Sequence, residues 1–186
     1  MSGTAPCAVG TVAATRRAEE ILALTLWAEA GIRPVRAIEA LAALVVNRAR
    51  LAATEAAARL RYAPEVPVRP GSPAPPWPLL LGPVCRAPFL FACWKPWPPG
   101  HALPGEAKEG DPALAICRRI AARAAAGVLP DPTGGATHWH DAGTLPGWAI
   151  GLVPTAEIGG LMFYRAEAEA PPSDARGIRC GAGAAR

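Results

Sequence analysis

The chain has 186 residues, of which 51% are hydrophobic and 18% are charged. This balance excludes an intrinsically disordered protein and allows one domain with a real core. The formal net charge is +4, but the Lys and Arg residues are scattered and form no basic run typical of nucleic-acid-binding arms. No apolar stretch reaches the length of a membrane span, and residues 1–17 lack the apolar segment of a secretory signal peptide. We therefore expect a globular protein that binds neither nucleic acid nor a membrane and has no export signal.

A first helix is predicted from about residue 15 to residue 30, because apolar residues recur there at spacings of three and four. Gly31 is a natural helix stop, and Pro34 fits the first turn of a second helix. That helix is amphipathic at its start. It is expected to continue, rich in alanine, to about Leu60, with a possible break near 47–50.

Most prolines fall between Pro64 and Pro112, so a long irregular Pro-rich insertion is expected over about 63–110. A loop of this length in a small domain is usually functional or mobile. A third helix is predicted to begin with Asp111 as its N-cap and with proline at its first position, and to end at Gly127.

Short extended segments are expected at 137–140 and 162–165, between Gly- and Pro-containing turns. The predicted organisation is an N-terminal arm (1–17), one domain (18–165) and a loosely ordered C-terminal tail (166–186). The predicted fold class is α+β and mainly helical, with a small strand element.

Five cysteines, Cys7, Cys85, Cys93, Cys117 and Cys180, form no C-x-x-C pair. Their odd number and wide spacing argue against a disulfide framework and against a four-thiolate metal site. Buried free thiols are the favoured interpretation, and a bond between Cys85 and Cys93 stays open as the alternative.

The segment W-A-E-A-G at 27–31 places Glu29 at the end of an apolar helix, beside a loop that turns back. A glutamate in such a partly desolvated position suits a general acid. The alternative is a surface glutamate with a weak ion pair. The helix dipole disfavours a carboxylate at this end, which makes that alternative less attractive.

The segment T-H-W-H at 137–140 is expected to place His138 and His140 on one side of a strand, and Asp141 follows directly. Many zinc sites use this spacing, so a metal-dependent site is a real alternative. His101 is the only other histidine and lies in the Pro-rich insertion, so the pair lacks a convincing third ligand. We therefore expect no metal and no cofactor, and assign both imidazoles to substrate binding or to support of the Glu29 cleft.

Three ordered blocks cover about residues 20–165. They are A-E-A-G-I-R-P (28–34) with V-V-N-R (45–48), then L-F-A-C-W (90–94), and finally D-P-T-G-G-A-T-H-W-H (131–140) with W-A (148–149) and I-G-G-L-M-F-Y (158–164). They resemble the blocks G-E-A-R-G-E-P with V-x-N-R, Q-F-S-C-W, and D-P-T-G-G-A-T-H-Y-H with W-A and I-G-x-H-x-F-Y. These are motifs of the SleB-type cell-wall hydrolases, which include the spore-cortex-lytic enzymes.

The resemblance implies a lysozyme-like fold, peptidoglycan as the substrate and Glu29 as the catalytic acid. The candidate substrate-binding residues are side chains of the second and third blocks: Phe91, Trp94, Thr137, His138, Trp139, His140 and Tyr164. For the aromatic residues among them, core packing is the alternative to stacking on sugars. Three positions depart from the family pattern: Arg33 replaces a Glu, Leu90 a Gln and Leu161 a His.

A glycosidase normally uses two carboxylates, and only Asp141 is available as a partner for Glu29 within the blocks. A lytic transglycosylase needs one acid, because the 6-hydroxyl of N-acetylmuramic acid closes a 1,6-anhydro ring. The resemblance implies this reaction, with cleavage of the glycan strand after N-acetylmuramic acid. The alternatives are a metal-dependent peptidoglycan amidase or peptidase that uses His138 and His140, and a non-catalytic wall-binding module.

A protein that acts on the cell wall, in the periplasm, needs a route to it when no signal peptide is visible. A phage or phage-like particle would supply one, either through a lysis system or in the particle's tail. The tail segment (166–186) and the Pro-rich insertion would then dock on tail or baseplate proteins. A bacterial protein with a misassigned start is the alternative.

Overall fold

The computed structural model describes residues 7–69, 71–88, 90–95 and 102–165. Its helices are α1 (Cys7–Ala30), α2 (Val35–Thr54), α3 (Ala56–Tyr62), α4 (Leu81–Arg86) and α5 (Pro112–Ala125). Its strands are β1 (His138–Asp141), β2 (Ala156–Ile158) and β3 (Leu161–Tyr164). The expected mainly helical α+β class agrees with these elements.

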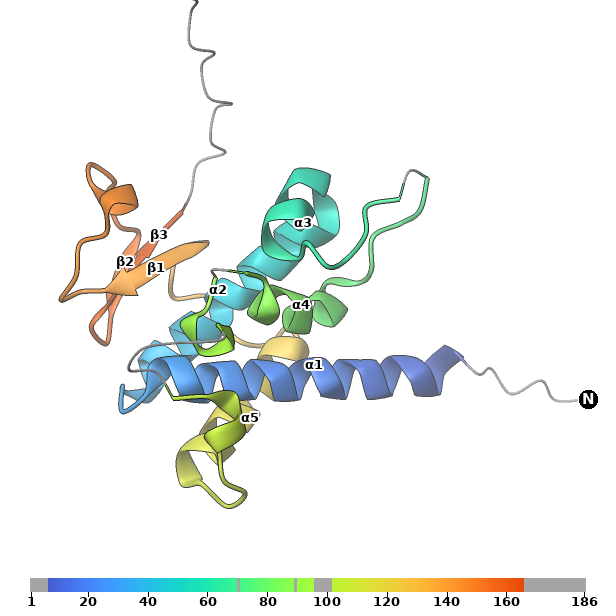
Figure 1. Cartoon of the computed structure of the whole chain (residues 1–186), viewed down its shortest axis with the longest axis horizontal. Coiled ribbons are helices and arrows are strands. Elements are labelled where there is room, and N and C mark those ends of the chain that lie inside the picture. The colour runs from blue at the N-terminus through green and yellow to red at the C-terminus, as the bar shows by residue number, and fades with distance from the viewer. Residues whose placement is uncertain (1–6, 70, 89, 96–101, 166–186) are drawn as a thin grey trace, which may run out of the picture.

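Helix α1 is the longest element and runs along the whole helical body, with α5 on one side and α2 and α4 on the other (Figure 1). The small sheet lies at the end of the body where α1 stops and α2 starts (Figure 1). Among the described helices, none combines the length and the hydropathy needed to cross a bilayer.

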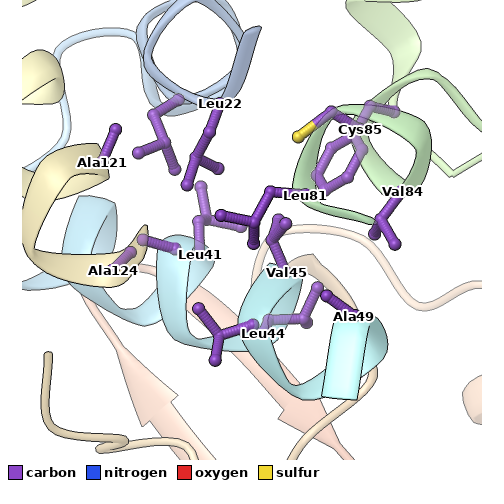
Figure 2. Packing of buried hydrophobic residues seen from close by; sticks show 14 of the residues in the cluster. Leu22, Leu41, Leu44, Val45, Ala49, Leu81, Val84, Cys85, Ala121 and Ala124 are labelled. Carbon is purple, nitrogen blue, oxygen red and sulfur yellow. The ribbon is translucent and has the colours of Figure 1, made fainter. Parts of the chain in front are cut away.

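One hydrophobic core joins these helices. Figure 2 shows Leu22 of α1, Leu41 and Val45 of α2, and Leu81 of α4 converging on one point, with Ala121 of α5 at its edge. Leu41 and Val45 recur at helical spacing, so one face of α2 contacts α1, α4 and α5 at once. This packing joins α1, α2, α4 and α5 in one core.

Two predicted helices have different limits in the structure. Helix α1 begins at Cys7 rather than near residue 15, so much of the expected N-terminal arm is helical. The second predicted helix does not break near 47–50 but at Glu55, whose backbone is extended (φ −121°, ψ 124°), and α3 follows. An Ala-rich sequence carries no strong signal for the position of such a break, because alanine favours helix throughout.

The third predicted helix is confirmed at its start. The Asp111 side chain accepts a hydrogen bond from the backbone N–H of Ala113 at 2.8 Å, and Pro112 is the first helical residue. The helix ends at Ala125, and Gly127 follows with a φ of 73°. A residue with a side chain would be strained in this left-handed conformation.

The Pro-rich insertion is not irregular throughout, which corrects the sequence-based expectation. It contains α4 and three short 3₁₀ turns, Trp77–Leu80, Ala92–Trp94 and Pro104–Glu106. Leu81 and Val84 of α4 are fully buried. Gly82 lets α4 approach α1 closely, because a Cβ atom there would lie 3.1 Å from Cδ1 of Ile21. Six residues are too few to show a helical period, and Gly and Pro suggested a loop.

Strand β3 is the central strand of an antiparallel sheet with the order β1-β3-β2. Its register pairs His138 with Tyr164 and Asp141 with Leu161. The two predicted strands are confirmed to within one residue, whereas the three-residue strand β2 was missed. Leu161 and Phe163 are fully buried and attach the sheet to the helical core.

The described cysteine side chains are free. Cys85, Cys93 and Cys117 are buried thiols, which agrees with the favoured interpretation and not with a Cys85–Cys93 bond. Burial raises the pKa of the Cys85 thiol to about 12. The side chain of Cys7, all of Cys180 and the expected tail (166–186) lie outside the part that the structure describes.

The burial of α4 predicts a measurable stability effect. Leu81→Ala should lower the free energy of unfolding by about 2–5 kcal/mol, because it leaves a cavity in the core. Leu60→Ala is the matched control, since Leu60 is 63% exposed and Leu81 is fully buried. The control should change stability by less than about 0.5 kcal/mol. Urea denaturation followed by circular dichroism measures both, and equal losses would mean that α4 is not part of the core.

Candidate active site

A cavity of about 590 Å³ lies between the end of α1 and strand β1. It is lined by side chains and backbone from both elements and from the loops beside them: Ala28, Glu29, Gly31, Arg33, Ala102, Trp139, His140 and Asp141. The first sequence block supplies one wall and the third block supplies the other. The cavity therefore unites segments that are more than a hundred residues apart in the sequence.

Glu29 occupies the last turn of α1 and is only 5% exposed, yet it lines this cavity. Its Oε1 accepts a hydrogen bond from the backbone N–H of Cys93 at 2.8 Å. The pKa of the Cys93 thiol is raised by burial and then by the charge of Glu29 and a hydrogen bond to it. The turn Ala92–Trp94 thus holds the carboxylate in one orientation.

The second block contacts the helices that carry the site, through Phe91 and Trp94. Phe91 is 3% exposed and packs in the core, with the Arg48 guanidinium 5.3 Å from its ring centre. Nε1 of the half-buried Trp94 donates to the hydroxyl of Thr25 at 2.9 Å. Neither side chain is part of the cavity lining, and the hydrogen bond of Trp94 goes to Thr25, one turn before Glu29 on α1.

His140 is buried in β1 and reaches the cavity. Its Nδ1 lies 2.8 Å from the carbonyl oxygen of Asp141, and its Nε2 lies 3.0 Å from the Tyr164 hydroxyl. A carbonyl can only accept, so Nδ1 carries the proton and Nε2 of the neutral ring accepts from Tyr164. Both ring nitrogens are therefore engaged within the protein.

Trp148 joins three of the candidate residues into one aromatic cluster. Its ring centre lies 5.6 Å from those of His138 and His140 and 5.4 Å from that of Tyr164. His140 and Tyr164 stack at 5.3 Å. Trp148 belongs to the turn Gly147–Ala149 and is 45% exposed. The W-A motif at 148–149 gave Trp148 no role, because its exposure and its contact with the two histidines appear only in the structure.

Arg33 connects the two walls. One terminal guanidinium nitrogen, Nη1, donates to the carbonyls of Glu29 and Ala30 at 3.4 and 3.2 Å, and Nη2 donates to the Asp141 carboxylate. The pKa of Asp141 is lowered by the backbone N–H of Gly143 and then by the charge and hydrogen bond of Arg33. Asp141, the only carboxylate that the sequence blocks offer as a partner for Glu29, is thus held in an ion pair with Arg33.

The N-R pair of the first block positions the third block. Asn47 donates to Asp131 at 3.0 Å and to the carbonyl of Ala136 at 3.1 Å. Nε of Arg48 donates to the Thr137 carbonyl at 2.7 Å. Burial lowers the pKa of Arg48 to about 10, and its Nη1 has no hydrogen-bond partner among the described residues. These two residues fix where β1 begins, and they lie outside the cavity.

The candidate residues fall into three groups. Glu29, Trp139 and His140 line the cavity itself. His138 and Tyr164 lie beside it, in the aromatic cluster with Trp148. The remaining three, Phe91, Trp94 and Thr137, are not part of the cavity lining, and the Thr137 hydroxyl contacts Nδ1 of His138 at 3.0 Å.

Within the described ranges, no three His, Cys, Asp or Glu side chains are grouped so that they could hold a metal ion. His101, which sequence reasoning named as the only other histidine, lies outside those ranges. His140 would have to release Tyr164 or the Asp141 carbonyl to bind a metal ion. The donor set at this site therefore favours hydrogen bonding over metal ligation.

The hydrogen bonds of His140 predict its tautomer. Nitrogen-15 NMR of the neutral imidazole should show the proton on Nδ1 and an unprotonated Nε2. Tyr164→Phe removes the hydroxyl that donates to Nε2, so the Nε2 resonance should shift while Nδ1 stays protonated. His138 serves as the internal reference, because its Nδ1 contacts the hydroxyl of Thr137. A dominant Nε2–H tautomer in the unsubstituted protein would contradict this arrangement.

The fold resembles one solved structure, the crystal structure of the catalytic domain of the Bacillus cereus SleB protein. The TM-score is 0.50 at 18% sequence identity, over 80% of this chain and 89% of that one. No protein-family model and no curated protein matches this chain. At this identity the likeness shows the fold alone, and it agrees with the fold that the three sequence blocks imply. The chain has a mainly helical α+β fold similar to that of the SleB catalytic domain.

Proposed function

We propose that this protein cleaves the glycan strand of peptidoglycan after N-acetylmuramic acid, as a lytic transglycosylase with Glu29 as its general acid. The observation that carries the proposal is the placement of Glu29. A nearly buried carboxylate, held by the Cys93 N–H, lines a cavity of about 590 Å³ in a fold similar to the SleB catalytic domain. The lysozyme-like architecture implied by the sequence blocks belongs to the same proposal.

The place of Glu29 in the cavity lining and its fixed hydrogen bond suit a general acid. A general acid must lie within hydrogen-bond reach of the atom that it protonates, and a sugar bound in the cavity would bring its glycosidic oxygen close to Glu29. The bond from Cys93 to Oε1 holds the carboxyl group in one orientation. Such orientation brings the acid to the glycosidic oxygen without a loss of side-chain freedom at the moment of reaction.

The reaction needs one acid. Glu29 donates its proton to the glycosidic oxygen, the bond between that oxygen and C1 of N-acetylmuramic acid breaks, and the electron pair stays on the oxygen. The 6-hydroxyl of the same sugar then bonds to C1, and its proton passes to the Glu29 carboxylate. The acid is restored, and the products are a free hydroxyl on the next sugar and a 1,6-anhydro end.

The aromatic cluster supplies a surface for the sugars. Trp139 lines the cavity, and Trp148 exposes almost half of its surface beside His138, His140 and Tyr164. Indole rings stack on the apolar faces of sugars, and the hydrogen bonds of His140 within the protein hold this surface in place. In this proposal the glycan lies across β1 and reaches Glu29 from the side of the sheet.

The proposal includes delivery by a phage or phage-like particle as the route to the wall. The tail segment (166–186) that would dock on tail or baseplate proteins lies outside the described residues. Peptidoglycan is the substrate partner, and no cofactor takes part in the reaction as written.

Glu29→Gln tests the general acid. The amide has the same shape but donates no proton to the leaving oxygen, so activity on purified sacculi should fall by about 10²–10⁴-fold or more. Turbidity loss of a sacculus suspension measures it. Glu157→Gln is the matched control, since Glu157 is an exposed residue of β2 and should keep full activity. A Glu29→Gln protein with a native circular dichroism spectrum and most of its activity would exclude this role.

The products test the reaction type. Mass spectrometry of digested glycan should show muramic ends that are lighter than hydrolytic ends by one water and that resist borohydride reduction. Reducible ends in the unsubstituted protein would mean hydrolysis. New free amino groups with intact glycan strands would mean cleavage of a peptide or amide bond, as in the metal-dependent amidase or peptidase alternative.

A further inference from the structure

We propose that Arg33 determines which nucleophile completes the reaction, because it withholds the Asp141 carboxylate from activating water. This inference rests on the proposed function and concerns the same cavity. Asp141 and Glu29 are the two acidic side chains in the described lining. A competing hydrolysis would use Asp141 as the base that activates water. A contact that occupies this carboxylate or lowers its basicity therefore slows hydrolysis.

The position of Arg33 makes it a brace between the two walls. It follows the turn at Gly31, and Nη1 donates to the last carbonyls of α1, those of Glu29 and Ala30. These carbonyls form the negative end of the helix dipole, which favours a cation there. Nη2 of the same guanidinium reaches the carboxylate of Asp141 at the end of β1. The side chains of Arg33 and Asp141 are 27% and 46% exposed, so solvent screens the charges and the contact acts mainly through its geometry.

Both oxygens of Asp141 are engaged. Oδ2 accepts from Arg33, and Oδ1 accepts from the backbone N–H of Gly143 at 3.1 Å. The Gly143 N–H makes the largest contribution to lowering the pKa of Asp141. Burial opposes this shift, and the charge of Arg33 adds to it. A carboxylate with a lowered pKa is a weaker base, so it takes a proton from water less effectively.

The two reactions differ in what attacks C1. In hydrolysis, water bonds to C1 and gives one proton to the Asp141 carboxylate, which leaves a reducing end. In transglycosylation, the 6-hydroxyl bonds to C1 and gives its proton to Glu29. The 6-hydroxyl is held on the same sugar, which raises its effective concentration. When Arg33 weakens the base that water needs, the internal hydroxyl attacks first.

Arg33 is thus a positioning residue that acts through Asp141, and the ratio of products reports its role. Arg33→Met removes the charge and the hydrogen bonds while keeping a long side chain. The ratio of reducible to anhydro muramic ends should rise by about tenfold or more, because a general base typically accelerates attack by at least that factor. Asp141→Asn alone should leave the ratio low. The double substitution Arg33→Met with Asp141→Asn should return the ratio to that of the unsubstituted protein.

A loss of stability alone would lower the rate of both reactions and leave their ratio unchanged. Arg33→Lys is the second variant, since it keeps the charge but not the fork that reaches both α1 and β1. Its ratio should lie between those of the unsubstituted protein and Arg33→Met. An unchanged ratio in both Arg33 variants, or a raised ratio that persists in the double variant, overturns the inference. The Glu29→Gln result and the products of the unsubstituted protein test the proposed function separately.

Discussion

The hydrogen bond from the Cys93 N–H to the Glu29 carboxylate is the interaction around which the site is arranged. A helix end leaves carbonyls without partners and supplies no donors to a carboxylate beside it. The donor therefore has to come from elsewhere, and the turn Ala92–Trp94 brings it from 64 residues away. Core packing of α4 holds the segment leading to this turn against α1, so the orientation of Glu29 depends on the whole helical body.

The sequence blocks divide into residues that can meet a substrate and residues that place them. Glu29 and His140 reach the cavity. Asn47 and Arg48 lie behind it and bind the segment that leads into β1. One sequence block thus contains both a residue that lines the cavity and residues that position the neighbouring segment. Burial of the Arg48 cation is unfavourable unless its N–H groups are hydrogen-bonded. Its Nε donates to the Thr137 carbonyl, and this bond connects α2 to the segment before β1.

Local signals predicted some elements well and others poorly, for identifiable reasons. Asp111 and the proline after it marked the start of α5, because a cap is a contact between neighbours in the chain. The first turns of α1 were missed because residues 7–14 are small and lack an amphipathic period, and they are helical as an extension of the turns that follow. Helix α4 and strand β2 were missed because six and three residues are too short for a period to show.

By itself, the sequence determined the mainly helical α+β class and the turn after α1, since these depend on residue types and near neighbours, and its resemblance to the SleB-type blocks named Glu29 as the candidate acid. Only the tertiary structure decided that Phe91 lies in the core and that Trp148 completes an aromatic cluster. It also decided that Arg33, which stands where the resembled family has an acid, pairs with Asp141 across 108 residues. The partner of a side chain is set by which segments the core brings together, and no local pattern records that choice.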